Sequence, residues 1–400
     1  MLYRPEAFER LTDESWDERR VRDGIRSIVA EADEVFDADA LWPVTDEWDA
    51  FEARTPLTTL YAGASGILWT LGNLGRRGHA ETRVDLASAA VHTLERWREE
   101  PDFEARHTPP VRTNASLYFG ETFPLLVAWQ FASSSHLADA IYELVRENAE
   151  NETNELMDGS PGTMLVAQAM LPTGEERWAE AWRASADVLV RRCDAEGLWT
   201  YRPYGRGLGA AHGASTNAAV LLQGSELLDA RLADELRRAT ARALERTAVL
   251  EGGHANWPMT AEELPELVGY DGQIRLQWCH GGAGVVASAS GYLDEELLLS
   301  GAELVWEAGP PGMEKGPGIC HGTAGNGYAF LKVFGRTGDE LWLERARRFA
   351  VHALGQVERW REERGRYRFS LWSGDIGAAL FAADCLDARP IVPIVDGIEA

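Results

Sequence analysis

The sequence contains two near copies of one stretch, Gln277-Trp278-Cys279-His280-Gly281-Gly282-Ala283-Gly284 and Gly318-Ile319-Cys320-His321-Gly322-Thr323-Ala324-Gly325. In both copies a Cys-His pair precedes a Gly-x-x-Gly turn, and an apolar segment that we expect to be helical follows the turn. A thiol at a helix N-terminus lies where backbone N–H groups and the helix dipole favour its thiolate form. Two such turns side by side would offer two sulfurs and up to two imidazoles, which is enough to bind zinc and leave one coordination position open.

The same turn recurs along the rest of the chain. It consists of a glycine, two further residues and often a second glycine. Its first glycine occurs seven times, as Gly63, Gly120, Gly159, Gly213, Gly281, Gly322 and Gly374. Two copies carry Phe123 and Thr216 in place of the second glycine. The spacings of 39 to 68 residues leave room for two helices in each repeat.

The segments between the turns predict two kinds of helix. Segments with small residues and little charge follow every turn. They indicate helices that are buried on all sides, at residues 67–74, 124–131, 163–171, 218–228, 285–293, 327–334 and 378–386. Amphipathic stretches rich in Arg and Glu lie at residues 19–36, 85–99, 176–193, 231–250 and 339–360. This alternation predicts an all-α fold, an α/α toroid (barrel) of seven inner and seven outer helices. We expect a single domain, in which residues 51–400 form the toroid and an N-terminal helical segment, residues 1–50, packs on it.

All seven turns should lie at one rim of the toroid, because each of them precedes an inner helix. Loops at one rim, with helix N-termini aimed at the centre, are a natural site for a metal or an anion. Soft thiolates combined with imidazole select zinc among the common cytosolic metals. We take Cys279, Cys320 and His321 as the zinc ligands. His280 occupies the place equivalent to His321, and the residue pattern alone does not choose between them.

A zinc ion with two thiolate ligands suits the binding and deprotonation of another thiol better than the hydrolysis of an amide. Addition of that thiol to an electron-poor alkene also requires a proton donor for the enolate. His212 lies on the same predicted rim and titrates in the right range. Glu155 and Asp158 could supply a supporting carboxylate, and Asp158 is the better candidate for a simple helix cap.

Composition excludes several classes of protein. The net charge of −25 argues against a nucleic acid or an anionic membrane as partner. The sequence contains no run of about 18 uncharged apolar residues, so it predicts no membrane span. The N-terminus lacks the pattern of a signal peptide. We therefore expect a cytoplasmic protein. In a cytoplasmic protein, metal binding explains the four cysteines better than a disulfide framework does. Cys193 and Cys385 lie outside the repeated motif and are expected to be ordinary core thiols.

The chain resembles the lanthionine synthetase C-like family, which comprises the cyclases of lanthipeptide synthesis and the LanC-like proteins. The resemblance runs from about Tyr61 to the C-terminus and is specific in both Cys-His-Gly stretches. It is also close at Gly209-Ala210-Ala211-His212-Gly213 and Phe369-Ser370-Leu371-Trp372-Ser373-Gly374. Ser215, Thr216 and Asn217 depart from the family pattern after His212, so the shape of the rim there is open.

The resemblance implies an α/α toroid with one zinc ion bound by Cys279, Cys320 and His321. It implies that His212 is the acid/base residue, that Glu155 matches a catalytic aspartate of the cyclases, and that Arg275 matches a functional arginine. It further implies a substrate contact for Lys315, which matches a residue that contacts glutathione in LanC-like proteins, and for Arg368. We also take His280 as a candidate for substrate binding, and its place in the motif leaves contact with zinc open.

We therefore expect a zinc-dependent enzyme that adds a thiol to dehydroalanine or dehydrobutyrine and forms a thioether. The thiol is either a peptide cysteine or a small thiol such as glutathione, and the partner is a peptide or protein that contains dehydroamino acids. The alternative from another class is a non-catalytic, zinc-containing protein that binds a peptide or glutathione. A glycosidase would need two carboxylates at the rim, for which Glu155, Asp158 and Asp375 are available, but it would leave the paired Cys-His turns without a role.

Overall fold

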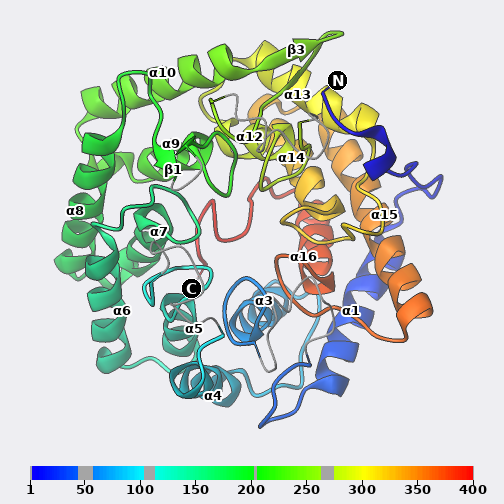
Figure 1. The fold of residues 1–400 in the computed structure, drawn as a ribbon. Helices are drawn as coiled ribbons and strands as arrows, with labels where there is room; N and C mark the ends of the chain where they lie inside the picture. Colours follow the sequence, from blue (N-terminus) through cyan, green and yellow to red (C-terminus); the bar gives the residue numbers. More distant parts are fainter. Residues whose placement is uncertain (1, 44–56, 103–112, 202–204, 263–273, 400) are drawn as a thin grey trace.

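The structure is a computed structural model, and it describes residues 2–43, 57–102, 113–201, 205–262 and 274–399. Fourteen α-helices in these residues form two concentric rings, so the predicted α/α toroid is confirmed (Figure 1). The inner ring consists of α3 (Ala64–Arg76), α5 (Thr122–Phe131), α7 (Ser160–Met170), α9 (Ala214–Gln223), α12 (Gly282–Ala289), α14 (Thr323–Thr337) and α16 (Asp375–Leu386). The outer ring consists of α1 (Glu18–Val35), α4 (Leu86–Glu99), α6 (Ser135–Asn148), α8 (Glu176–Arg192), α10 (Ala230–Thr247), α13 (Glu295–Ala308) and α15 (Glu340–Arg364).

The ring closes between its first and last inner helices. Helix α16 packs against α3, and α1 covers the outside of this junction by packing against α16 and α15. The remaining regular structure of the described residues is short. Three 3-10 turns, η1 (Pro5–Ala7), η2 (Leu171–Thr173) and η3 (Ser225–Leu227), accompany two antiparallel hairpins, β1 (Thr200–Tyr201) with β2 (Gly205–Arg206) and β3 (Val249–Glu251) with β4 (His254–Asn256).

The two rings differ because their sequences differ. Eleven of the twelve residues of α16 are buried, as the low charge of the inner segments predicts. In α10, by contrast, the buried residues recur at helical spacing on one face, at Ala233, Leu236, Thr240 and Ala243. Most outer helices begin at an Asp or Ser whose side chain accepts a backbone N–H of the first turn, as Asp229 does in α10. Each outer helix therefore buries a single stripe against the inner ring.

Each inner helix begins at or just after a glycine that has no room for a side chain. A Cβ atom added to any of the seven first glycines would lie between 1.9 and 2.5 Å from a backbone atom four to six residues earlier in its own turn. Gly281 also has a φ of +106°, which side chains other than glycine rarely adopt. Both turns that lack a second glycine still precede an inner helix. Helix α9 begins directly after Gly213, whereas α5 begins one residue later than the pattern of the other inner helices, at Thr122. Phe123 and Thr216 are fully buried there.

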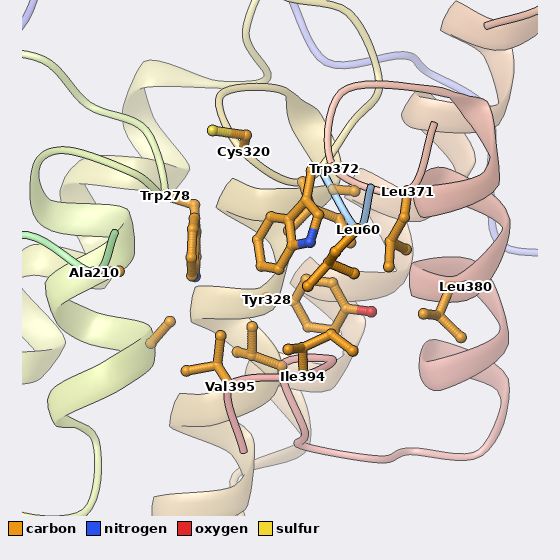
Figure 2. Close-up of a cluster of buried hydrophobic side chains, with 14 of the residues drawn as sticks. Leu60, Ala210, Trp278, Cys320, Tyr328, Leu371, Trp372, Leu380, Ile394 and Val395 are labelled. Atoms are coloured by element: carbon orange, nitrogen blue, oxygen red, sulfur yellow. The ribbon is translucent and has the colours of Figure 1, made fainter. Parts of the chain in front are cut away.

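The C-terminal residues close the opposite end of the toroid. Residues 387–399 run into the centre of the ring, where Ile394 and Val395 are buried (Figure 1). Gln223 donates from Nε2 to the carbonyl of Val395 at 2.9 Å. Figure 2 shows this apolar centre, in which Trp278 and Trp372 lie between Cys320 and the C-terminal residues. Among the described helices, none combines the length and the apolar character required to span a membrane.

Candidate active site at the rim of the toroid

Backbone hydrogen bonds join the seven glycine turns into a ring. The residue two positions before a first glycine donates its N–H to the carbonyl of the equivalent residue in the next turn. Six such bonds occur, with N···O distances of 3.2 Å for Tyr61 to Tyr118, 3.2 Å for Tyr118 to Met157, 3.3 Å for Ala211 to Cys279, 2.9 Å for Cys279 to Cys320, 2.7 Å for Cys320 to Trp372 and 3.4 Å for Trp372 to Tyr61. The turns that carry the two predicted thiols are thus direct neighbours on one rim.

The hydrogen-bonded ring is interrupted between the third and the fourth turn. Met157 donates its N–H to Oε2 of Glu155 at 3.0 Å, and within the described ranges no backbone hydrogen bond joins Met157 to Ala211. Side chains bridge this junction instead. Asn217 donates from Nδ2 to the carbonyl of Asn154 at 2.8 Å, and the His212 ring binds the Glu155 carboxylate. The interruption therefore coincides with the predicted acid/base pair.

Glu155 is a fully buried carboxylate that organises the turn before α7. Its Oε1 accepts the backbone N–H groups of Asp158 and Gly159 at 2.6 and 3.1 Å. Its Oε2 accepts the N–H of Met157 and also contacts Nδ1 of His212 at 2.6 Å. The sequence favoured Asp158 as the helix cap, but α7 has Gly159 at its N-cap and no side-chain cap hydrogen bond. The Glu155 side chain instead folds back over the turn that precedes the helix. Glu155 is therefore both a structural acceptor and the partner of His212.

The His212 ring is fixed on three sides. Nδ1 faces Glu155, and the ring stacks on Tyr201 with centroids 4.6 Å apart and an interplanar angle of 10°. His280 stacks at 5.4 Å and 29°. Burial lowers the pKa of His212, but the charge and hydrogen bond of Glu155, with smaller contributions from Cys279 and Asp158, outweigh it and raise the pKa above its ordinary value.

The thiols of Cys279 and Cys320 lie in hydrogen-bond contact with each other and are almost fully buried. Burial raises the pKa of Cys279. The hydrogen bond from Cys320, the charges of Arg275 and His212, and a hydrogen bond from Gln277 Nε2 at 2.9 Å reverse this and lower that pKa to about 7.

Cys320 behaves in the opposite way. Its hydrogen bond to Cys279 and its burial raise the pKa of Cys320 well above the ordinary value, although Tyr61 and Lys315 oppose this shift. The two pKa values are therefore shifted in opposite directions, and Cys279 is the sulfur that loses its proton more readily.

The predicted metal centre is only partly formed by the described side chains. The two adjacent sulfurs suit a thiolate-binding cation such as Zn²⁺. Within the described part of the chain, however, no group of three or more His, Cys, Asp or Glu side chains is arranged to hold a metal ion. His321 lies at the start of α14 and is half-buried, and His280 packs on His212. Burial, His212 and Arg275 hold the pKa of His280 well below its ordinary value, so its ring is neutral. The complete ligand set of Cys279, Cys320 and His321 stays a prediction.

The three predicted basic residues lie in different surroundings. Arg275 is exposed, and its charge acts on Cys279 and His280. Lys315 is half-buried, and its charge acts on Cys320. Arg368 is instead 2% exposed and covers the ring of Trp360 at 4.2 Å, and its guanidinium packs against Gly316. Arg275 and Lys315 therefore flank the thiols, whereas Arg368 supports the turn before Cys320 from beneath.

Three residues near the reactive groups were not singled out from the sequence. Tyr61 hydrogen-bonds to Cys320, and it occupies the same place in its turn as Cys320 does, so the repeat contained a signal for it. Gln277 lies two residues before Cys279 in the duplicated stretch, where its contact with the sulfur could have been suspected. Tyr201 belongs to a hairpin outside the repeated turns, and no pattern in the sequence points to it.

The chain is similar to known proteins in its sequence and in its fold. The family model described as lanthionine synthetase C-like protein matches residues 57–395. The glutathione S-transferase LANCL1 of Danio rerio is 34% identical over 135 residues, which are 30% of this chain and 30% of that protein. The LanC-like protein GCL1 of Arabidopsis thaliana is 37% identical over 85 residues, or 19% of each chain. The chain thus matches less than a third of the length of either relative.

Among solved structures, nisin cyclase is similar over nearly the whole chain. The TM-score is 0.61 at 16% sequence identity, and the match covers 92% of this chain and 94% of the cyclase. At this identity the likeness shows that the two proteins share a fold.

Proposed function

Because the chain belongs to the lanthionine synthetase C-like protein family, we propose that it adds a thiol to dehydroalanine or dehydrobutyrine in a peptide or protein and forms a thioether. The observation that carries the proposal is the pairing of two adjacent, buried thiols with a carboxylate-supported histidine on the same rim. A relative named glutathione S-transferase and a fold relative named nisin cyclase agree with thiol chemistry of this kind.

The proposed cofactor is Zn²⁺, held by Cys279 and Cys320 with His321 as the third ligand. Thiolates and imidazole are the donors that zinc prefers, and three protein ligands leave one position for the substrate thiol. When bound, zinc lowers the pKa of that thiol, so that the thiolate is available near neutral pH. Lys315 and Tyr61 face Cys320 and would help to keep its sulfur in the charged form that a metal requires.

His212 handles the proton in the proposed reaction. The substrate sulfur forms a bond to the β-carbon, and the electron pair of the C=C bond moves toward the carbonyl, which gives an enolate. The proton that the thiol loses is the one that the α-carbon needs, and Nε2 of His212 can carry it. Glu155 holds Nδ1 at 2.6 Å, so it keeps a proton on that nitrogen and leaves Nε2 as the nitrogen that exchanges a proton in the proposed reaction.

Arg275 and Lys315 are the proposed contacts for the substrate. They flank the thiols in a chain whose net charge is −25, so they form a local region of positive charge in an otherwise acidic molecule. Arg275 is the better placed for the carbonyl of the dehydroamino acid, because its charge already reaches His280 beside His212. Lys315 would bind a carboxylate of a small thiol such as glutathione. An intermolecular addition therefore fits this site somewhat better than ring closure.

The test is turnover of a dehydroalanine peptide with glutathione, followed by mass spectrometry. The wild type should yield the peptide with one added glutathione. His212→Ala should reduce turnover by roughly 100-fold or more, since a general acid/base contributes a factor of this order. The variant should retain its fold and its zinc. A wild type that binds the peptide or glutathione, holds zinc and yet gives no product would instead be a non-catalytic binding protein.

A further inference from the structure

We infer that Tyr201 is a positioning residue for His212. The phenol ring of Tyr201 covers one face of the imidazole and holds it in the plane that presents Nε2 to the thiols. The expected effect on kcat rests on the proposed function, because it requires that His212 takes part in thiol addition. The positioning of the ring does not depend on it. Its observation is the near-parallel stack of the two rings, with centroids 4.6 Å apart and an angle of 10°. Figure 1 places β1, which carries Tyr201, beside α9, which begins just after His212.

The stack completes the restraint of the His212 ring. Glu155 holds its Nδ1 edge, and His280 covers the second face at 5.4 Å. Neither contact prevents the ring from tilting toward the side of Tyr201. The phenol ring blocks this movement, because two stacked rings at van der Waals distance leave no space for a tilt. The His212 side chain accordingly remains only 18% exposed.

The hairpin of Tyr201 is held independently of His212. Tyr201 pairs with Gly205, and the neighbouring Arg206 donates to Glu262 from its backbone N–H at 2.8 Å and from Nε at 2.6 Å. Ala261 in turn donates its N–H to the carbonyl of Arg206 at 2.9 Å. The position of the phenol ring is thus set by backbone pairing and an ion pair, which makes it a fixed surface for the histidine.

The stack also favours the protonated histidine. The face of a phenol ring attracts a cation, and an imidazolium ring lies in the right place to benefit. The other charged and titratable groups that face His212 are Glu155 and Asp158 from the turn before α7, and Cys279 and His280 from the turn before α12. The contribution of Tyr201 is added to theirs and can be measured separately, because Tyr201 lies on a different element.

The test compares Tyr201→Leu, which removes the aromatic face, with Tyr201→Phe, which retains it. The readouts are the titration of the His212 ring, followed by NMR with His212→Ala to assign its signal, and the split between kcat and KM. For Tyr201→Leu, the titration midpoint should fall by about one pH unit. Its kcat should fall roughly tenfold to a hundredfold, with KM nearly unchanged. Tyr201→Phe should resemble the wild type in both. Tyr201→Met serves as a second non-aromatic variant if Tyr201→Leu does not fold.

Two results would overturn the inference. One is an unchanged His212 midpoint and kcat in a folded Tyr201→Leu or Tyr201→Met protein. The other is an equal loss in Tyr201→Phe, which would assign the effect to the hydroxyl. A lowered midpoint in a protein that shows no thiol addition, wild type included, would support the positioning of His212 and reject the proposed function. The two failures are therefore distinguishable.

Discussion

Among single residues, Glu155 connects the architecture of the rim with its chemistry. Its carboxylate accepts three backbone N–H groups of its own turn and still contacts His212. The Glu155 carboxylate therefore has two roles. It takes the Met157 N–H at the point where the hydrogen-bonded ring of turns is interrupted, and it orients His212, the proposed acid/base residue. A change at this position should affect both.

We predict that Glu155→Gln lowers turnover by a factor of roughly 10 to 100 and destabilises the protein by about 1–3 kcal/mol. The amide keeps the shape but places an N–H group where Met157 N–H or His212 Nδ1 requires an acceptor. It also removes the negative charge that raises the pKa of His212, so less of the histidine is protonated near neutral pH. Steady-state kinetics and urea unfolding measure the two effects.

Glu175→Gln is the matched control, because this carboxylate lies outside the rim, where it pairs with Arg177 in α8. It should leave turnover unchanged and alter stability only slightly. Wild-type turnover in Glu155→Gln would contradict the role that we assign to the carboxylate.

The sequence alone brought Glu155 and His212 to one rim of the toroid, but it did not single out Tyr201. Glu155 and His212 belong to repeated turns, so the repeat brings them to one rim whatever the details of packing. The distinction between Glu155 and Asp158 depended on how one side chain folds over its own turn, which spacing does not encode. Tyr201 approaches His212 from a hairpin that pairs through tertiary contacts. The burial of Arg368 under Gly316 has the same origin.

Among the structural elements, the glycine turn is the one that positions the thiols. In the turn before α12, Gly281 has a φ of +106°, and a Cβ atom there would lie 1.9 Å from the carbonyl oxygen of Arg275. The backbone of Arg275 and that of Cys279 are thereby held in one tight loop. This loop also receives hydrogen bonds from Asn256, whose Nδ2 donates to the carbonyl of Arg275 at 3.2 Å.

We predict that Gly281→Ala destabilises the protein by about 2 kcal/mol or more, because the new methyl group must displace the Arg275 backbone and the residue must adopt a positive φ. It should also reduce zinc content and turnover, since the Cys279 sulfur moves with the loop. Gly291→Ala is the control, because Gly291 has no atom within 4 Å of an added Cβ. Thermal unfolding and metal analysis check both variants, and a fully metallated, wild-type-like Gly281→Ala would refute this account of the turn.

The sequence also predicted these elements well, for a physical reason. Every inner helix follows a glycine that cannot be replaced without a clash, and the same few residues specify each turn. Seven inner helices could therefore be counted directly. Outer helices α6 and α13 were not among the amphipathic stretches that we identified, and the alternation of the repeat was required to expect them. Both hairpins were missed, because two or three residues per strand leave no periodic pattern.

For the molecule as a whole, closure of the ring depends on a buried polar cluster. Asp384 of α16 binds Arg77 at the end of α3, with Nη1 and Oδ1 2.8 Å apart. It also accepts a hydrogen bond from the Tyr328 hydroxyl of α14 at 2.6 Å. Three inner helices thus meet at one carboxylate. Burial outweighs the attraction of Arg77 and raises the pKa of Asp384 to about 6.

This shift predicts how pH affects stability. Because the folded protein holds the Asp384 proton more tightly than the unfolded chain does, the stabilisation is full at pH values below the ordinary Asp pKa. It is lost as pH rises through about 6. Relative to Asp384→Asn, the free energy of unfolding of the wild type should therefore fall by at most about 3 kcal/mol as the pH rises from about 4 to 7. Urea unfolding across this range measures the difference, and a difference independent of pH would contradict the assignment.

The two neighbouring thiols are proposed to form an open zinc centre, and the zinc content of the purified protein tests this proposal. The measurement is zinc per chain in the wild type, in Cys320→Ala and in Cys193→Ala, whose half-buried cysteine lies outside the rim, all purified without chelator. We predict about one zinc per chain in the wild type and in Cys193→Ala, and none in a Cys320→Ala protein that retains its helical circular dichroism. A folded wild type without zinc, or a Cys320→Ala protein that keeps its zinc, would show that these thiols do not form the zinc centre.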